Sequence, residues 1–294
     1  MIRLDAATVL LQWATGGLLF LWVTSRDRVV GIGYGWLLRA SYGVIALGAL
    51  VVGRRLEPVA VRDACAALVV LATAAALAVS VLRRRAGVAG ERARRERRAA
   101  RVAAMTGGPP EGGADPAVKA DGRREPDPSV PEFPPVLDLV APVIGAVGLI
   151  AAGVAAGGPD GLAVARTVVG AAFLGAVSDA MLLGHWYLVQ PGLGRQPLVA
   201  LNRWLIRLWP VEVAVLLWPT GMVSVLSGSI DDGYGGILGW FWVTCAVSTL
   251  ALAFVTKAAL KERSYSAVMA ATGLLYLAIL TAFGTDLVAR AVLA

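Results

Sequence analysis

The sequence is poor in the residues that carry most metal, haem and redox chemistry. Its 294 residues include one histidine, His185, and two cysteines, Cys65 and Cys245, which lie far apart inside apolar runs. A disulfide framework needs more cysteines at closer spacing, and a zinc site needs Cys-x-x-Cys pairs or several histidines. A b-type haem with two imidazole ligands needs two histidines, so one chain cannot hold it. We therefore expect no metal site and a non-haem protein.

Charged residues and catalytic signatures are also scarce. Only 16% of the residues are charged, whereas 57% are hydrophobic. No Walker motif, nucleophile elbow or His-Glu-x-x-His motif occurs, which argues against soluble-type enzymology. The apolar share exceeds that of ordinary globular, fibrous and disordered chains. The composition predicts an all-α, polytopic integral membrane protein.

The positive charge is concentrated in one segment. The net charge is +7, and the segment from Arg83 to Arg101, with nine arginines and two glutamates, accounts for all of it. Between Trp36 and Phe133 the only aromatic residue is Tyr42, so a nucleic-acid surface with stacking rings is not expected. We predict contact with anionic lipid headgroups, with docking of an acidic partner as the alternative. The basic residues predicted at the membrane surface are Arg83, Arg84, Arg85, Arg94, Arg95, Arg97 and Arg98.

About eight segments are apolar over roughly the 20 residues that a membrane-spanning helix needs. They cover residues 6–23, 36–53, 63–82, 137–156, 163–189, 205–227, 236–258 and 266–289. The sixth contains Pro210 and Pro219, which predict kinks. The chain thus divides into a three-helix part (1–82), a linker that is Arg-rich and then Pro/Gly-rich (83–136), and a five-helix part (137–294).

The distribution of lysine and arginine predicts the orientation. Cytoplasmic loops of membrane proteins carry an excess of these residues. This rule places the disordered 83–136 linker in the cytoplasm and both chain termini outside. The bias toward Ala, Gly, Val and Arg favours a bacterial inner membrane.

Ionisable residues inside apolar spans are costly and are therefore candidate functional groups. His185 lies near the cytoplasmic end of the fifth predicted span, and Asp179, six residues earlier, lies about 9 Å deeper. Glu212 lies about seven residues into the sixth predicted span, at a depth that matches His185. A short loop joins these two spans and favours their being neighbours. We expect the three side chains to form a chain of protonatable groups.

Three further residues complete this predicted site. Trp186 and Tyr187 are expected to form its walls, and Arg39 of the second span is expected to supply a counter-charge. A simpler interpretation makes the two aromatic residues an interfacial belt and pairs Glu212 with Arg203 or Arg207.

The predicted function is that of a quinone- or lipid-binding membrane subunit of a bacterial respiratory or redox complex, with other membrane redox subunits as partners. A histidine that hydrogen-bonds a carbonyl, beside acids that relay protons, suits a quinone head. One alternative is a proton-coupled small-solute transporter, and another is a structural or assembly protein without a ligand. Only one kinked helix is evident, and the division into three and five helices is not a duplication, which argues against a transporter built from repeats.

Overall fold

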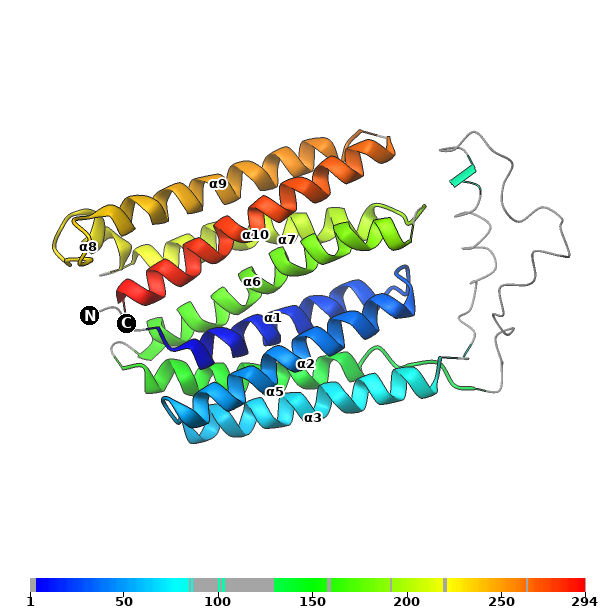
Figure 1. Cartoon of the computed structure of the whole chain (residues 1–294), viewed down its shortest axis with the longest axis horizontal. Coiled ribbons are helices and arrows are strands. Elements are labelled where there is room, and N and C mark those ends of the chain that lie inside the picture. Colours follow the sequence, from blue (N-terminus) through cyan, green and yellow to red (C-terminus); the bar gives the residue numbers. More distant parts are fainter. Residues whose placement is uncertain are drawn as a thin grey trace, which may run out of the picture.

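The computed structural model describes residues 4–84, 130–157, 160–190, 192–218, 221–262 and 264–293, together with 86, 100, 102 and 103. The elements that build the body of the molecule are helices that run side by side (Figure 1). In chain order they are α1 (Ala6–Ser25), α2 (Ile32–Arg55), α3 (Ala60–Leu82), α5 (Leu137–Ala155), α6 (Asp160–Val189), α7 (Gln196–Leu217), α8 (Met222–Leu226), α9 (Ile237–Ala259) and α10 (Tyr265–Leu293).

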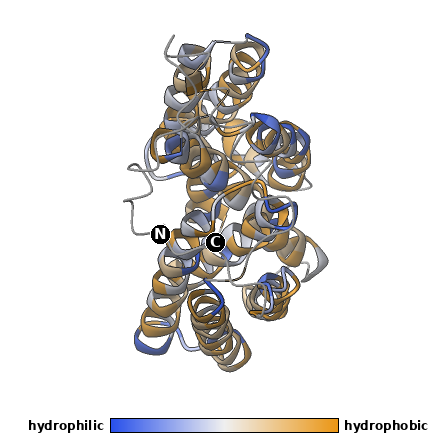
Figure 2. Cartoon of the chain, turned by 90° about the vertical axis from the view of Figure 1, so that its right-hand side faces the viewer, coloured by the Kyte–Doolittle hydropathy of each residue, from blue (hydrophilic) through white to orange (hydrophobic). Residues whose placement is uncertain are grey.

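Seven of the described helices are long and apolar enough to cross a membrane: α1, α2, α3, α5, α6, α9 and α10. Hydrophobic residues cover their outward faces as well as the core (Figure 2). Leu71 and Trp240 are examples, 64% and 67% exposed. An apolar surface of this extent is expected of side chains that face lipid. The chain is therefore a multi-pass, all-helical membrane protein.

The sixth predicted span differs most from the structure. Helix α7 begins at Gln196, nine residues before the predicted start, and ends at Leu217. Its three charged residues, Arg203, Arg207 and Glu212, lie close together near the middle of the helix, and α7 is not among the seven helices that are apolar enough to cross a membrane. Pro219 lies outside the described residues, and Trp218 before it already adopts an extended conformation (φ −99°, ψ 150°), as residues before proline prefer. The chain resumes in the short helix α8, and the count of eight spans stays a prediction.

Helix α6 connects the two sides of the bundle. It packs against α1 and α5 on one side and against α7 and α10 on the other, while α9 pairs with α10 and α7. Helix α5 follows the predicted linker in sequence, yet it packs against α1 and α3. The packing therefore joins α5 to the first three helices, across the boundary at which the sequence divides the chain.

Glycines allow the closest approach in the bundle, between α1 and α6. A Cβ atom at Gly16 would lie 1.8 Å from the carbonyl oxygen of Ala171, and one at Gly175 would lie 2.2 Å from the carbonyl carbon of Gly16. No side chain fits in this space, so the two backbones are in direct contact. Small residues have this role in membrane helix packing, where lipid offers no hydrophobic driving force between helices.

Candidate functional site

Arg39 of α2 lies in a different place from the one predicted. Its Nε and Nη2 atoms donate to the two carboxylate oxygens of Asp138, at 2.8 and 2.7 Å, and both side chains are buried. Ser25 also donates to this carboxylate, and the guanidinium lies over the ring of Phe133, 4.6 Å from its centroid. Arg39 therefore ties α2 to the first turn of α5. The counter-ion of Arg39 is therefore Asp138 and not Glu212.

His185 lies on the outside of the bundle. Its Nδ1 atom is 3.1 Å from the hydroxyl of Tyr276 in α10, and the two rings meet edge to face. The neighbouring Trp186 donates from Nε1 to Gln190, 2.9 Å away, and packs against Tyr34 of α2. These contacts connect α6 to α2 and α10 at one end of the bundle.

Tyr187, the second predicted wall, is buried. Its hydroxyl donates to the carbonyl oxygen of Gly194 at 2.6 Å, and its own carbonyl oxygen lies 3.5 Å from the hydroxyl of Tyr265. Tyr187 thus closes the turn between α6 and α7. It faces away from the exposed imidazole of His185, so the two do not line one pocket.

The structure does not bring His185 and Glu212 together. Glu212 lies 16 residues into α7, about 24 Å from the end of the helix that adjoins α6. His185 lies in α6, four residues before this helix ends at that same end of the bundle. The predicted match in depth is wrong because α7 begins earlier than its apolar run. Glu212 instead lies five residues from the other end of α7, at the end of the bundle where α1 begins and α10 ends (Figure 1).

Asp179 is fully buried near the middle of α6. Its Oδ1 atom accepts a hydrogen bond of 2.5 Å from the hydroxyl of Tyr42, and its backbone carbonyl accepts a longer one, of 3.4 Å, from the hydroxyl of Tyr34. Its Oδ2 atom has no hydrogen-bond partner among the described residues. Neighbouring Ser178 accepts from Nε1 of Trp13 in α1. Asp179 therefore belongs to a polar contact between α2 and α6, apart from His185 and Glu212.

Glu212 is fully buried beside two charged residues of α10. Asp286 and Arg290 both act on its carboxyl group electrostatically. The Nε atom of Arg290 donates to both oxygens of Asp286, at 3.0 and 2.9 Å, so this arginine already has a carboxylate partner. Neither oxygen of Glu212 has a hydrogen-bond partner among the described residues.

A glycine of α6 makes room for this group. A Cβ atom at Gly170 would lie 2.6 Å from Oδ1 of Asp286, 2.7 Å from Nε2 of Gln12 and 2.9 Å from Nη2 of Arg290. Three polar side chains from α1 and α10 thus converge on the α6 backbone. We call Glu212, Asp286, Arg290 and Gln12 the interior polar cluster. The Asp286–Arg290 pair could have been found in the sequence, because oppositely charged residues four apart on a helix are neighbours.

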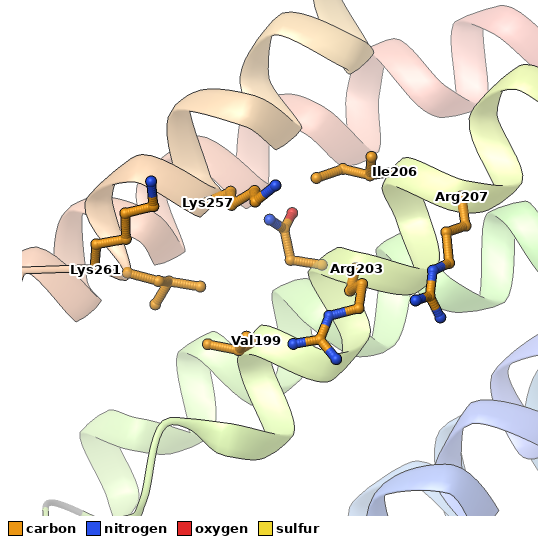
Figure 3. Close-up of a pocket in the computed structure, with 8 residues that line it drawn as sticks. Val199, Arg203, Ile206, Arg207, Lys257 and Lys261 are labelled. Atoms are coloured by element: carbon orange, nitrogen blue, oxygen red, sulfur yellow. The ribbon is translucent and has the colours of Figure 1, made fainter.

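A pocket of about 490 Å³ lies between α7 and α9 (Figure 3). Four basic residues line it, in two pairs that are each spaced by four residues. Arg203 and Arg207 project from α7, Lys257 projects from α9, and Lys261 lies two residues beyond the end of that helix. The remaining lining residues are Val199, Asn202, Ile206 and Leu260, and we call the eight together the basic pocket. This pocket was not predicted from the sequence, although residues four apart on a helix, such as Arg203 and Arg207, lie on one face.

Asn202 fixes the register of the two pocket helices. Its Nδ2 atom donates to the carbonyl oxygen of Ala253 at 3.0 Å. Seven residues further along α7, Nε1 of Trp209 donates to the carbonyl oxygen of Ala246 at 2.8 Å. The side chain of Asn202 is buried, and its Oδ1 atom has no partner among the described residues. The pocket therefore contains a hydrogen-bond acceptor as well as cations.

Of the seven basic residues predicted at the membrane surface, Arg83 and Arg84 follow directly after α3. Nη1 of Arg83 donates to the carbonyl oxygen of Glu132 at 2.9 Å. The other five, Arg85, Arg94, Arg95, Arg97 and Arg98, lie outside the described residues, as does most of the predicted linker. Within the described part of the chain, no group of three or more His, Cys, Asp or Glu residues is placed to hold a metal ion.

Comparison with protein-family models, with curated proteins and with solved structures found no match to this chain. The arrangement of its own residues is therefore the basis for a functional proposal.

Proposed function

We propose that the protein binds an anionic phospholipid in the basic pocket, at the end of the bundle from which Arg83 and Arg84 emerge. The observation that carries the proposal is the unbalanced charge of the pocket. Four cations line it, and none of them forms an ion pair with an acidic residue in the described ranges. Like charges four residues apart on a helix destabilise it by about 0.2–0.5 kcal/mol per pair, and an anion would relieve this repulsion.

The chemistry of the lining matches each part of a phospholipid such as phosphatidylglycerol. The guanidinium and ammonium groups supply donors to phosphate oxygens. The free Oδ1 atom of Asn202 accepts from a glycerol hydroxyl group. Val199 and Ile206 give the pocket an apolar wall for the start of the acyl chains.

The position of the pocket also suits a lipid. Lys257 is two residues from the end of α9, whereas Arg207 lies about 16 Å into α7. The pocket therefore extends from the end of the bundle toward its middle, as a headgroup with attached chains does. Basic pockets between helices near a membrane surface are a known mode of headgroup recognition.

This proposal selects lipid over quinone from the two ligands that the sequence suggests. A quinone head is neutral and does not need four cations, and the residues predicted to bind it are dispersed over the molecule. Membership of a redox complex stays a prediction, which co-purification of redox subunits from native membranes would check.

The test is native mass spectrometry of the full chain with phosphatidylglycerol or phosphatidylcholine. We expect selective retention of phosphatidylglycerol. The double variant Lys257→Gln/Lys261→Gln should weaken it by about 2 kcal/mol, roughly 30-fold, since each basic residue near a membrane surface contributes about 1 kcal/mol. The matched control is Arg54→Gln/Arg55→Gln, which removes two exposed charges at the far end of α2.

Three outcomes would contradict the proposal. The first is equal retention of the two lipids, and the second is equal loss of phosphatidylglycerol in the lysine variant and in its control. The third is displacement of the lipid by soluble glycerol phosphate or by a quinone at equimolar concentration, which would identify a site for a soluble anion or for a quinone.

A further inference from the structure

We propose that Glu212 is a proton-binding site: its carboxyl group holds a proton at neutral pH and exchanges it with the water at the end of the bundle where α1 begins and α10 ends. This inference does not rest on lipid binding. The basic pocket lies toward the opposite end of α7 and shares no residue with the interior polar cluster.

Glu212 has no counter-ion of its own among the described residues. Its side chain is fully buried, and its two oxygens accept no hydrogen bond from the described residues. Arg290 is engaged by Asp286, and its Nη2 atom also donates to the carbonyl oxygen of Arg166 at 2.8 Å. An ionised carboxylate that is buried without a partner costs several kcal/mol, so such a group takes up a proton instead.

The charged residues of the neighbouring helices do not supply a counter-ion to Glu212 either. Arg166 of α6 is engaged with α7 backbone, since its Nε and Nη2 atoms donate to the carbonyl oxygens of Val215 and Trp218 at 2.8 and 3.1 Å. Helix α9 carries one charged residue, Lys257, at its opposite end, and α8 carries none. Asp286 and Arg290 are the charged side chains that act on Glu212, and as an ion pair they are neutral as a unit.

Gln12, in the same cluster, has a buried hydrogen-bond acceptor that is not used. Gln12 of α1 is 0% exposed, and its Nε2 atom donates to the carbonyl oxygen of Thr167 at 3.0 Å. Its Oε1 atom has no partner among the described residues. This buried acceptor is available to a hydrogen-bond donor, and a protonated carboxyl group is one.

A route to water is short. Glu212 is five residues, about 8 Å, from the end of α7. The hydrogen bond from Nη2 of Arg166 to the carbonyl oxygen of Trp218, just past the last turn of that helix, is exposed. Uptake is a simple transfer: a hydronium ion gives its proton to one oxygen of Glu212, and a water molecule remains. The resulting hydroxyl can donate to the carboxylate of Asp286.

The experiment is infrared spectroscopy of the full chain in lipid nanodiscs. Glutamate labelled with ¹³C at the side-chain carboxyl separates its carbonyl stretch from that of Asp179 without any mutation. We expect a band of protonated glutamic acid at neutral pH that moves with the label and shifts in heavy water. Glu212→Gln should remove this band, whereas the control Glu262→Gln, at an exposed position, should retain it.

The absence of a label-sensitive protonated band at neutral pH would overturn the proposal. So would a band that survives Glu212→Gln, or a band in the wild type that does not respond to heavy water. Because the first and third of these results are measured on the labelled wild type, misfolding of a variant cannot conceal them.

Discussion

Replacing Arg39 by methionine removes a buried charge from the contact between α2 and α5 while keeping an unbranched apolar side chain in place of the aliphatic part of the arginine. In the wild type the guanidinium donates to both oxygens of Asp138, and the two side chains are only 4% and 2% exposed. Without Arg39, the carboxylate keeps a single side-chain hydrogen bond, of 3.1 Å, from Ser25. The variant therefore leaves a buried, nearly unpaired charge.

The expected loss of unfolding free energy follows from this burial. Removing one partner of a buried ion pair costs about 3–5 kcal/mol, out of about 5–15 kcal/mol for a typical domain. The chain offers a contrasting pair in Arg26 and Asp27, whose atoms lie 3.9 Å apart and whose side chains are 48% and 73% exposed. Arg26→Met should cost less than about 1 kcal/mol, because water screens that pair.

The assay is reversible unfolding of the purified chain in mixed micelles, followed by circular dichroism. The double variant Arg39→Met/Asp138→Leu should cost less than the sum of its two single variants, since it leaves no charge unpaired. If Arg39→Met costs no more than Arg26→Met, or if the double variant equals that sum, then the pair does not hold α2 against α5 and the reasoning fails.

Two further predictions concern a glycine contact and a loop carboxylate. Gly175→Ala should destabilise the chain by about 1–3 kcal/mol, because the new methyl group meets the α1 backbone, whereas Gly273→Ala, with nothing within 4 Å, should be neutral or stabilising; equal effects in thermal unfolding would contradict the α1–α6 contact. The backbone N–H groups of Gly236, Tyr234 and Leu238 donate to Asp232 in the loop before α9 and hold the pKa of its carboxyl below the usual value. Its contribution to stability is thus complete above the ordinary aspartate pKa of about 4 and is lost as the pH falls through the lowered value; a pH titration of unfolding should show this loss in the wild type and not in Asp232→Asn, and identical profiles would be inconsistent with it.

Composition and hydropathy were enough to predict an all-helical, multi-pass membrane protein, and they located most helices within a few residues. The helices predicted at 6–23, 137–156 and 236–258 are observed as Ala6–Ser25, Leu137–Ala155 and Ile237–Ala259. This succeeds because a span is defined by the composition of about 20 consecutive residues, which is a local property. It fails at α7, where Arg203 and Arg207 interrupt the apolar run although the backbone stays helical. A backbone that enters the membrane must satisfy its own hydrogen bonds whatever its side chains are.

Which polar side chains meet depends on how the helices pack. The sequence singled out Arg39, Asp179, His185 and Glu212 as unusual, since ions at membrane depth are rare; three of them are buried in the structure, and His185 is exposed. It placed them in one site, whereas each has its own neighbours, on helices that are far apart in sequence. Which faces of two helices touch depends on their rotation and on close contacts such as the one at Gly175. The composition of a span carries no information about that rotation, so the partners of these residues were decided by packing alone.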